Sequence, residues 1–302
     1  MLNTSRFFSR LSYHSGVVIP PFFPGYMKKA FFNRTSFEPV FMKYQFDEES
    51  NKYIKARFRN LLDDYKKDFA KSSCLVSLSI GQPVHYGNFL AATLALVNEN
   101  FDSCVFVLGD TLKRHTMIIS QRETEEAMYI RAKFEGDQWV EKNVSMLSKL
   151  QIPWKIIRWD HWLNDPRYPN LVERIKRDIG KDKEYKEIFD EDASDFIDRV
   201  KNRNELAISE DEARKRCLNY LVEENAAMCL WPNEQCEFEL YANGRTKSMQ
   251  ATYEKYIQVL HPHLLRPISL RFRKVEHILK NSDDEQEKEI VNDSSRPTIF
   301  IK

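Results

Sequence analysis

The stretch C-L-V-S-L-S-I-G-Q-P-V-H-Y-G-N, residues 74–88, decides the fold class of this 302-residue chain. It opens with a short apolar run that is bounded by Gly81 and Pro83, which is typical of a buried strand. A helical pattern follows over 87–98, and a second buried strand is expected over 103–108. A strand, a turn, a helix and a strand in this order form a βαβ unit, so the sequence predicts a parallel sheet.

The remaining pattern extends this unit into one large domain. Further strands are expected over 154–159, 236–241 and 268–275. Helices are expected over 53–71, 121–150 with an interruption near Gly136, 168–179, 182–201, 248–260, and from the S-x-x-E capping box of Ser209 and Glu212 to 229. The predicted fold is therefore α/β and Rossmann-like, with a mostly parallel sheet and helices on both faces. We expect an N-terminal extension (1–50), a catalytic domain (51–280) and a flexible C-terminal tail (281–302).

Composition excludes several broad classes. Lys and Arg number 46 against 45 Asp and Glu, so any nucleic-acid surface must be a local basic patch. No apolar run reaches the roughly 18 residues of a membrane span. The five cysteines lie far apart without a C-x-x-C, which predicts no metal site, no disulfide framework and a cytoplasmic location. The first 37 residues lack Asp and Glu, which leaves a mitochondrial transit peptide as the alternative.

Polar side chains gather where ligands bind in such folds, at the carboxyl ends of the strands. Ser77 and Ser79 end the first strand, and Tyr241 ends a later one. Tyr220 and Glu224 lie four residues apart on the capped helix, so they share one helix face. A serine beside a phenol and a carboxylate is suited to covalent and acid–base catalysis. Taken singly, the serines are more typical of strand-end turns, and the pair is more typical of a solvated helix surface.

In their order and spacing, these residues resemble the tRNA-dependent cyclodipeptide synthases over residues 70–260. The run S-L-S at 77–79 takes the place of the family's G-x-S, and Y-L-V-E-E at 220–224 supplies its Y-x-x-x-E. Tyr241, 21 residues after Tyr220, corresponds to the family's second tyrosine. Three departures mark a divergent member: Ser77 in place of glycine, Gln82 where one subfamily has asparagine, and Ala242 in place of histidine or proline.

The resemblance implies a catalytic domain similar to that of class I tyrosyl- and tryptophanyl-tRNA synthetases. It implies an aminoacyltransferase that takes two aminoacyl-tRNAs per turnover and releases a 2,5-diketopiperazine, without ATP, a metal or another cofactor. Ser79 would accept the first aminoacyl group, the second aminoacyl-tRNA would attack through its amine, and the resulting dipeptidyl-enzyme would cyclise. Glu224 and Tyr220 would hold the amine, Tyr241 would relay a proton, and a backbone N–H near Gly81 would bind the oxyanion.

The resemblance also implies substrate contacts. Ser77, Gln82, Val107 and Leu108 would lie near the first aminoacyl group, and the last two favour a hydrophobic product such as cyclo(Leu-Leu) or one containing Phe. For the tRNA we favour basic residues of the long helix, Arg131, Lys133 and Lys142, over Lys66, Lys67 and Lys71 before the first strand. The enzyme would act as a monomer, and the composition of its ends is compatible with a yeast pathway of the pulcherriminic-acid type.

Two other functions remain open. H-Y-G-N at 85–88 and T-K-S-M at 246–249 loosely match synthetase ATP motifs and would indicate an ATP-using ligase, but Asn88 replaces the second histidine and suits a helix cap. A catalytically inactive tRNA-binding protein is the other alternative, because Ser77 and Ala242 depart from the family pattern. Three polar residues follow the second strand: Asp110, Arg114 and His115. They indicate either part of a site or a turn closed by a salt bridge.

Overall fold

The computed structural model describes residues 12–14, 17–19, 46–47, 52–59, 68–242 and 244–276. Lys66, Lys67 and the tail over 281–302, for which the sequence made predictions, lie outside these residues. Among the residues described, no helix has the length and apolar character that crossing a membrane requires. All five cysteines are free thiols, and four of them are buried.

One sheet of nine described strands organises the molecule, in the order β1-β2-β7-β6-β5-β8-β9-β4-β3. Its centre is parallel and consists of β7 (Trp154–Arg158), β6 (Ser103–Gly109), β5 (Ser73–Ser79), β8 (Phe238–Tyr241) and β9 (Arg266–Glu276). Antiparallel strands extend both edges: β4 (Lys52–Arg59) and β3 (Phe46–Asp47) beyond β9, and β2 (Val17–Ile19) and β1 (Ser12–His14) beyond β7. The predicted α/β, Rossmann-like fold with a mostly parallel sheet is confirmed.

The two faces of the sheet carry separate cores, because successive side chains of a strand point to opposite faces. From β5, Cys74, Val76 and Leu78 pack against α3 (Gly87–Asn100) and α5 (Glu125–Leu147). Leu75 packs on the other face, against α6 (Trp159–Leu163), the end of α9 (Glu210–Met228) and α10 (Lys247–Thr252). Ser77 and Ser79 share the face of Leu75, so they belong to the α9 side of the sheet.

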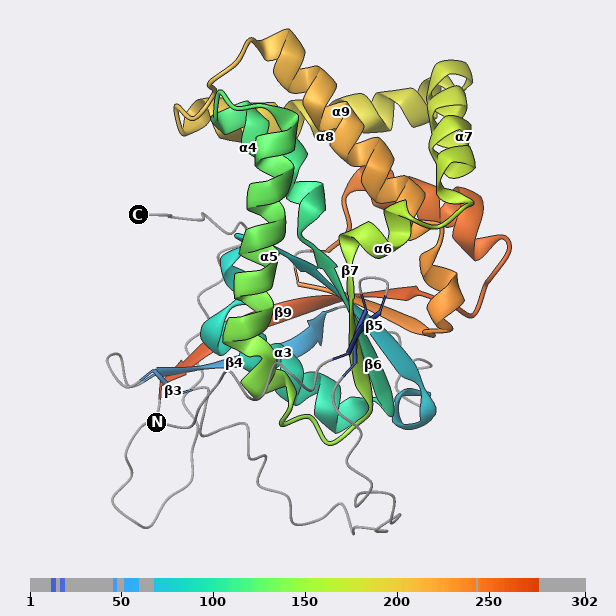
Figure 1. Cartoon of the computed structure of the whole chain (residues 1–302). Coiled ribbons are helices and arrows are strands. Elements are labelled where there is room, and N and C mark those ends of the chain that lie inside the picture. The colour runs from blue at the N-terminus through green and yellow to red at the C-terminus, as the bar shows by residue number, and fades with distance from the viewer. Residues whose placement is uncertain are drawn as a thin grey trace, which may run out of the picture.

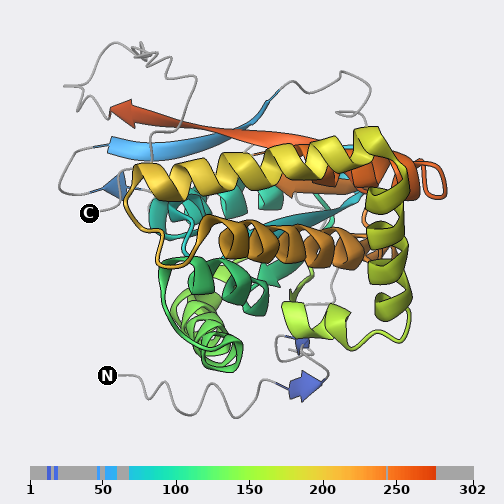
Figure 2. The ribbon, with the colours of Figure 1, turned by 90° about the horizontal axis from the view of Figure 1, so that it is seen from above.

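A third core joins the helices on the α9 side. Figure 1 shows α7 (Tyr168–Lys181), α8 (Lys183–Asn202) and α9 grouped together, away from α3, and Figure 2 shows them from above. Their contact includes α4 (Arg114–Ser120) and is built from buried apolar residues such as Ile119, Ile175, Phe189, Ile197 and Leu221. Ser209 caps α9 as predicted, since its Oγ accepts a hydrogen bond from the Glu212 amide at 3.3 Å. The Glu212 carboxylate binds Arg216, so only the serine half of the capping box is formed.

Two local sequence predictions are wrong. The basic run predicted as a helix over 53–71 begins as strand β4, because Ile54, Ala56 and Phe58 alternate with cations and pack toward α3. Residues 60–67 of this run lie outside the described residues. Asn88 does not cap α3, whose first turn follows Tyr86 without a side-chain cap.

The long helix α5 is not interrupted at Gly136, because this glycine serves packing rather than a break. A buried pair lies against it, in which Arg158 Nε donates to Asp110 Oδ2 at 2.5 Å. Arg158 also donates to the carbonyl of Lys133, which ties α5 to the ends of β6 and β7. A Cβ atom at Gly136 would lie 2.5 Å from Asp110 Oδ2 and 2.6 Å from Arg158 Nη2, so only glycine fits.

Gly136→Ala is therefore expected to destabilise the protein by about 1–3 kcal/mol, the usual cost of overpacking a tight interior. Gly180→Ala in α7 is the matched control, since nothing lies within 4 Å of its added Cβ. The control should be neutral or stabilising by up to about 1 kcal/mol, because alanine favours helix. Urea unfolding of both variants checks this, and equal stabilities would contradict the packing role of Gly136.

Candidate active site

Ser79 ends β5 in a turn whose backbone is held from several sides. Its N–H donates to His85 Nδ1 at 2.8 Å, and its carbonyl accepts from the Gln82 amide at 3.4 Å. Gly81 adopts a φ of +87°, which favours glycine at this point of the turn. Burial lowers the pKa of His85 to about 4, so the imidazole is neutral and supports the backbone of Ser79. The run H-Y-G-N is thus a turn and a helix start.

Tyr241 lies across from this turn at the end of β8. In the parallel register Tyr241 is opposite Ser77, and the side chain of Ser79 lies near enough to the Tyr241 hydroxyl to oppose the rise of its pKa. Burial and then the nearby carboxyl of Glu224 raise the pKa of Tyr241, so the phenol keeps its proton. The half-buried Ser79 hydroxyl therefore has a second hydroxyl near it that is suited to exchanging protons.

The third part of the site is the predicted pair on α9. The Tyr220 hydroxyl donates to Glu224 Oε1 at 3.1 Å. Burial, helped by the charges of Asp192 and Glu239, raises the pKa of Glu224 to about 8 against the opposing hydrogen bond from Tyr220. The charge state of Glu224 acts on both tyrosines, Tyr220 and Tyr241. The four residues predicted to be catalytic are thus brought together.

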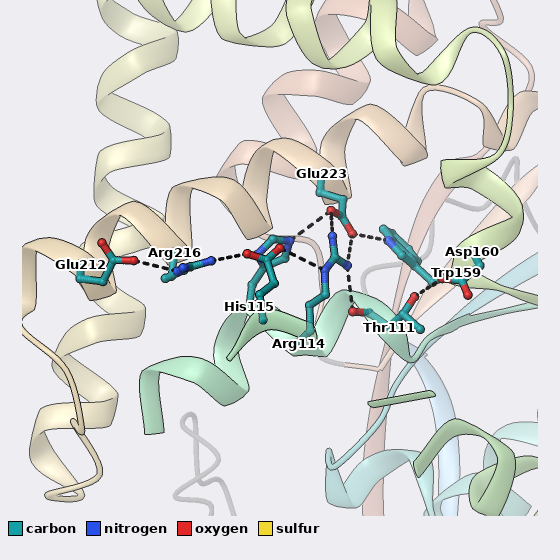
Figure 3. Close-up of polar contacts among 9 residues, drawn as sticks. Thr111, Arg114, His115, Trp159, Asp160, Glu212, Arg216 and Glu223 are labelled. Carbon is teal, nitrogen blue, oxygen red and sulfur yellow. Dashed lines mark hydrogen bonds and ion pairs between the residues drawn. The ribbon is translucent and has the colours of Figure 1, made fainter. Parts of the chain in front are cut away.

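Glu223, the residue before Glu224, has the opposite environment (Figure 3). Arg114 donates to both of its oxygens, at 2.8 Å and 2.5 Å, and Trp159 Nε1 donates at 2.9 Å. His115 Nε2 lies 3.1 Å from Oε2. Burial would raise the pKa of Glu223, but the hydrogen bonds from His115 and Arg114 outweigh it and lower the pKa. Glu223 is therefore ionised and fixes α9 to the segments that follow β6 and β7.

This arrangement resolves the alternatives left open for three residues after the second strand. Arg114 and His115 hold α9 through Glu223, and Asp110 binds Arg158. All three support the site and lie outside the group around Ser79. The sequence analysis missed Glu223, although the doubled glutamate in Y-L-V-E-E was a signal.

The other residues predicted to contact substrate do not all lie on the catalytic face of the sheet. Val107 pairs with Ser77 in register and packs on the α9 side of the sheet. Leu108 packs with Leu78 on the opposite face, so its predicted contact with substrate is wrong. Gln82 is half-buried in the turn after Ser79.

The predicted oxyanion donor and the predicted ATP motif also have definite places. The Gly81 N–H donates to the Tyr86 hydroxyl at 3.0 Å, so that bond must open before this amide can bind an oxyanion. In T-K-S-M, Thr246 caps α10 and Lys247 binds Glu191 at the surface. Within the described ranges, no group of three or more His, Cys, Asp or Glu residues has the arrangement of a metal site.

A basic ribbon, which we define as Lys55 and Arg57 of β4 with Arg271 and Arg273 of β9, continues the catalytic side of the sheet. Arg57 is directly opposite Arg271, and Lys55 opposite Arg273. These side chains share the face of Ser269, which pairs with Tyr241. Like charges directly opposite one another destabilise a sheet, so this concentration of cations suits a polyanion.

The basic residues predicted to bind tRNA on α5 lie among polar and acidic residues. Arg131 donates to Gln121 at 2.7 Å and to Glu135 at 3.3 Å. Lys133 and Lys142 are exposed. Asp137 lies between these lysines in sequence and binds Arg158, so this face carries acidic as well as basic groups.

The raised pKa of Glu224 predicts a pH dependence of stability. Between pH 4.5, the ordinary pKa of a glutamate, and about pH 8, the Glu224 carboxyl is mostly protonated in the folded chain and mostly ionised in the unfolded chain. Stability contributed by the buried neutral carboxyl is present below 4.5 and is lost as pH rises toward 8, by up to about 1.4 kcal/mol per unit. Glu224→Gln should remove this loss, so the variant gains stability over wild type between pH 5 and pH 8.5. A constant difference in the free energy of unfolding would contradict the assignment.

Comparison with known proteins identifies the family. No protein-family model matches the chain, and no curated protein matches it by sequence. A solved CDPS (cyclodipeptide synthase) from Fluoribacter dumoffii is 37% identical, with a TM-score of 0.70, over 73% of this chain and 98% of that chain.

More distant structures share the fold. The cyclodipeptide synthase from Candidatus Glomeribacter gigasporarum, solved bound to Phe-tRNAPhe, is 16% identical with a TM-score of 0.57, over 72% of this chain and 94% of that chain. The one from Bacillus thermoamylovorans is 13% identical with a TM-score of 0.54, over 74% and 96%. Because it is 37% identical to the Fluoribacter protein over 98% of that protein's length, this chain belongs to the cyclodipeptide synthases.

Proposed function

We propose that this cyclodipeptide synthase forms its product from two aminoacyl-tRNAs through an aminoacyl ester on Ser79. Synthesis of cyclodipeptides from aminoacyl-tRNA follows from membership of the family. The observation that carries the serine intermediate is the placement of Ser79 and Tyr241 at the ends of adjacent strands, beside the buried carboxyl of Glu224 that Tyr220 holds. An aminoacyl ester is already activated, so a covalent serine can divide the synthesis into easier transfers.

The first step moves the aminoacyl group to the enzyme. Ser79 Oγ attacks the ester carbonyl, the bond from that carbon to the ribose oxygen breaks, and the serine proton ends on the ribose hydroxyl. Tyr241 lies near Ser79 Oγ and can pass this proton on. The tRNA leaves as a neutral alcohol, so no oxidant or nucleotide is consumed.

Bond balance decides the direction of the second step. A dipeptidyl-enzyme forms only if the amine of the serine-bound aminoacyl group attacks the ester of the second aminoacyl-tRNA. Attack in the reverse direction, which was the expectation from sequence, would leave the dipeptide on the tRNA and free Ser79. In the last step the new terminal amine attacks the ester on Ser79, which closes the ring and restores the hydroxyl.

Glu224 is suited to the protons of these amines. Its pKa of about 8 is close to the roughly 7.7–8.0 of an α-amino group. Matched proton affinities let a proton pass between them at little free-energy cost. Tyr220 orients the carboxyl through its hydrogen bond to Oε1.

For the nucleic acid we propose the basic ribbon as the main phosphate contact. It lies on the side of the sheet that carries Ser79 and Tyr241, so a stem held there can direct its aminoacyl end into the site. The relative from Candidatus Glomeribacter gigasporarum was solved with Phe-tRNAPhe, which supports a tRNA partner. Contacts by Arg131, Lys133 and Lys142 stay a prediction. So do a monomeric state, a pathway of the pulcherriminic-acid type and a cytoplasmic location, the last supported by the free thiols.

The two basic surfaces can be separated by salt dependence. Replacing Arg57 and Arg271 by alanine should weaken binding of aminoacyl-tRNA. It should also reduce the slope of log affinity against log salt by about 0.7–0.9 for each lost phosphate contact. Lys133 and Lys142 changed to alanine are the matched control, with a near wild-type slope. The reverse result, measured by filter binding, would assign the tRNA to α5.

The serine intermediate has a direct test. Wild type mixed with aminoacyl-tRNA and quenched in acid should gain one aminoacyl mass, and released diketopiperazine should accumulate. Ser79→Ala should show neither, while Ser145→Ala, an exposed serine of α5, should behave as wild type. Tight binding of tRNA without acylation or product would instead support the catalytically inactive alternative.

The ATP-using ligase gains no support from the site geometry. His85 is buried and bound to the backbone of Ser79, and Lys247 is occupied by Glu191 at the surface. Neither lies where it would hold a nucleotide phosphate.

A further inference from the structure

A buried glutamate lies deeper on the catalytic face than the residues discussed above. Glu239 precedes Tyr241 by two residues on β8, so both side chains are on the same face of the sheet. In the register Glu239 is opposite Leu75, and Tyr241 is opposite Ser77. Only 1% of Glu239 is exposed, so a charged side chain is placed in the interior below the site.

Only one oxygen of this carboxylate is satisfied. Arg245 donates to Oε2 through Nε at 3.0 Å and through Nη2, which also donates to the Leu265 carbonyl. The guanidinium lies over the ring of Tyr253, 4.1 Å from its centre, so Arg245 is fixed on the outer side. Oε1 of Glu239 is buried without a hydrogen-bond partner among the described residues. An acceptor in this state is costly unless a donor reaches it in the working enzyme.

Two further acceptors nearby share this condition. Glu224 Oε2 and Asn225 Oδ1 are also buried without a described partner. The carboxylate of Glu239 acts electrostatically on both Glu224 and Tyr241, so it belongs to the same buried group. Glu239 Oε1 therefore lacks a donor on the face of the sheet that carries Ser79 and Tyr241, and a ligand with N–H donors would supply one.

We propose that Glu239 selects the first aminoacyl group by the side chain of that amino acid. Oε1 of Glu239 accepts a hydrogen bond from an N–H donor at the end of the aminoacyl side chain. This inference rests on the proposed function, because it assumes that the aminoacyl group is carried on Ser79. The α-amine uses Glu224, which leaves Glu239 for the side chain. An apolar side chain would leave Oε1 unsatisfied, and a carboxylate side chain would be repelled.

The register adds a requirement of length. Leu75, the partner of Glu239, is four residues before Ser79, which corresponds to about 13 Å along the strand. The side chains of Ser79 and Glu239 cover only part of that distance. A long side chain must cover the rest, so lysine, arginine and glutamine fit better than serine or asparagine. The earlier expectation of a hydrophobic product used Val107 and Leu108, and only Val107 is on this face.

The first experiment uses the wild-type protein and tests the substrate class without any substitution. Separate tRNAs charged with lysine, arginine, glutamine, leucine or phenylalanine are each mixed with the enzyme and quenched in acid. Intact-protein mass then reports which aminoacyl group is carried. We expect acylation by one or more of the first three, at least tenfold above leucine and phenylalanine, and the member that acylates best distinguishes an ammonium, a guanidinium and an amide.

Glu239→Leu and Glu237→Leu form the matched pair of variants. Glu237 lies just before β8, where its carboxylate binds Ser73 away from the site. Glu239→Leu should shift the acylation ratio at least tenfold toward leucine, whereas Glu237→Leu should keep the wild-type ratio. A purely structural role would lower all acylation together without changing the ratio, and that result would overturn the proposal even if the variant folds poorly.

The outcomes separate the two levels of inference. Acylation of the wild type by leucine or phenylalanine, with none by the N–H-bearing group, would overturn the role of Glu239 and leave the Ser79 intermediate intact. If no charged tRNA acylates the protein, the proposed function itself fails, and this inference fails with it.

Discussion

The buried carboxylate of Glu223 is the interaction on which the arrangement of the site depends. It receives donors from Arg114 in α4 and from Trp159 in α6, and it contacts His115. These segments follow the carboxyl ends of β6 and β7, while Glu223 itself belongs to α9. One side chain therefore fixes both the position of α9 over the sheet and its rotation about its own axis.

That rotation gives two neighbouring glutamates different chemistry. Successive residues of a helix point about 100° apart, so Glu223 turned toward α4 and α6 leaves Glu224 turned toward β8. Glu223 is ionised because it is paired, and Glu224 is held neutral by burial up to a pKa of about 8. When their environments give two neighbouring carboxyls different pKa values, the two can take different roles. One stays ionised and serves as an anchor, and the other can act as an acid or base. Here the anchor is permanently charged, and its neighbour can carry a proton during the reaction.

The sequence contained enough to predict the central sheet and the three side chains grouped with Ser79. Strand ends, a capped helix and the i, i+4 spacing are local signals, and parallel strands bring their ends to one edge. Leu108 was misplaced because adjacent strand residues point to opposite faces. The strand β4 was taken for a helix because its charges hid a period of two. The doubled glutamate marked Glu223 but could not identify its partners, since Arg114 and His115 lie more than a hundred residues earlier in the chain.

The central claim is that the pairing of Glu223 with Arg114 positions Glu224 for catalysis. A double-mutant cycle of Glu223→Gln and Arg114→Met, scored by the free energy of unfolding and by the rate of Ser79 acylation, tests it most directly. Each single variant should lose about 3 kcal/mol, as expected when one member of a buried pair is removed, and should acylate more slowly. The double variant should recover part of the stability without recovering the rate. Glu205→Gln, in an exposed pair with Arg203, is the control and should change stability by less than about 0.5 kcal/mol. Acylation at the wild-type rate by the single variants would contradict the account.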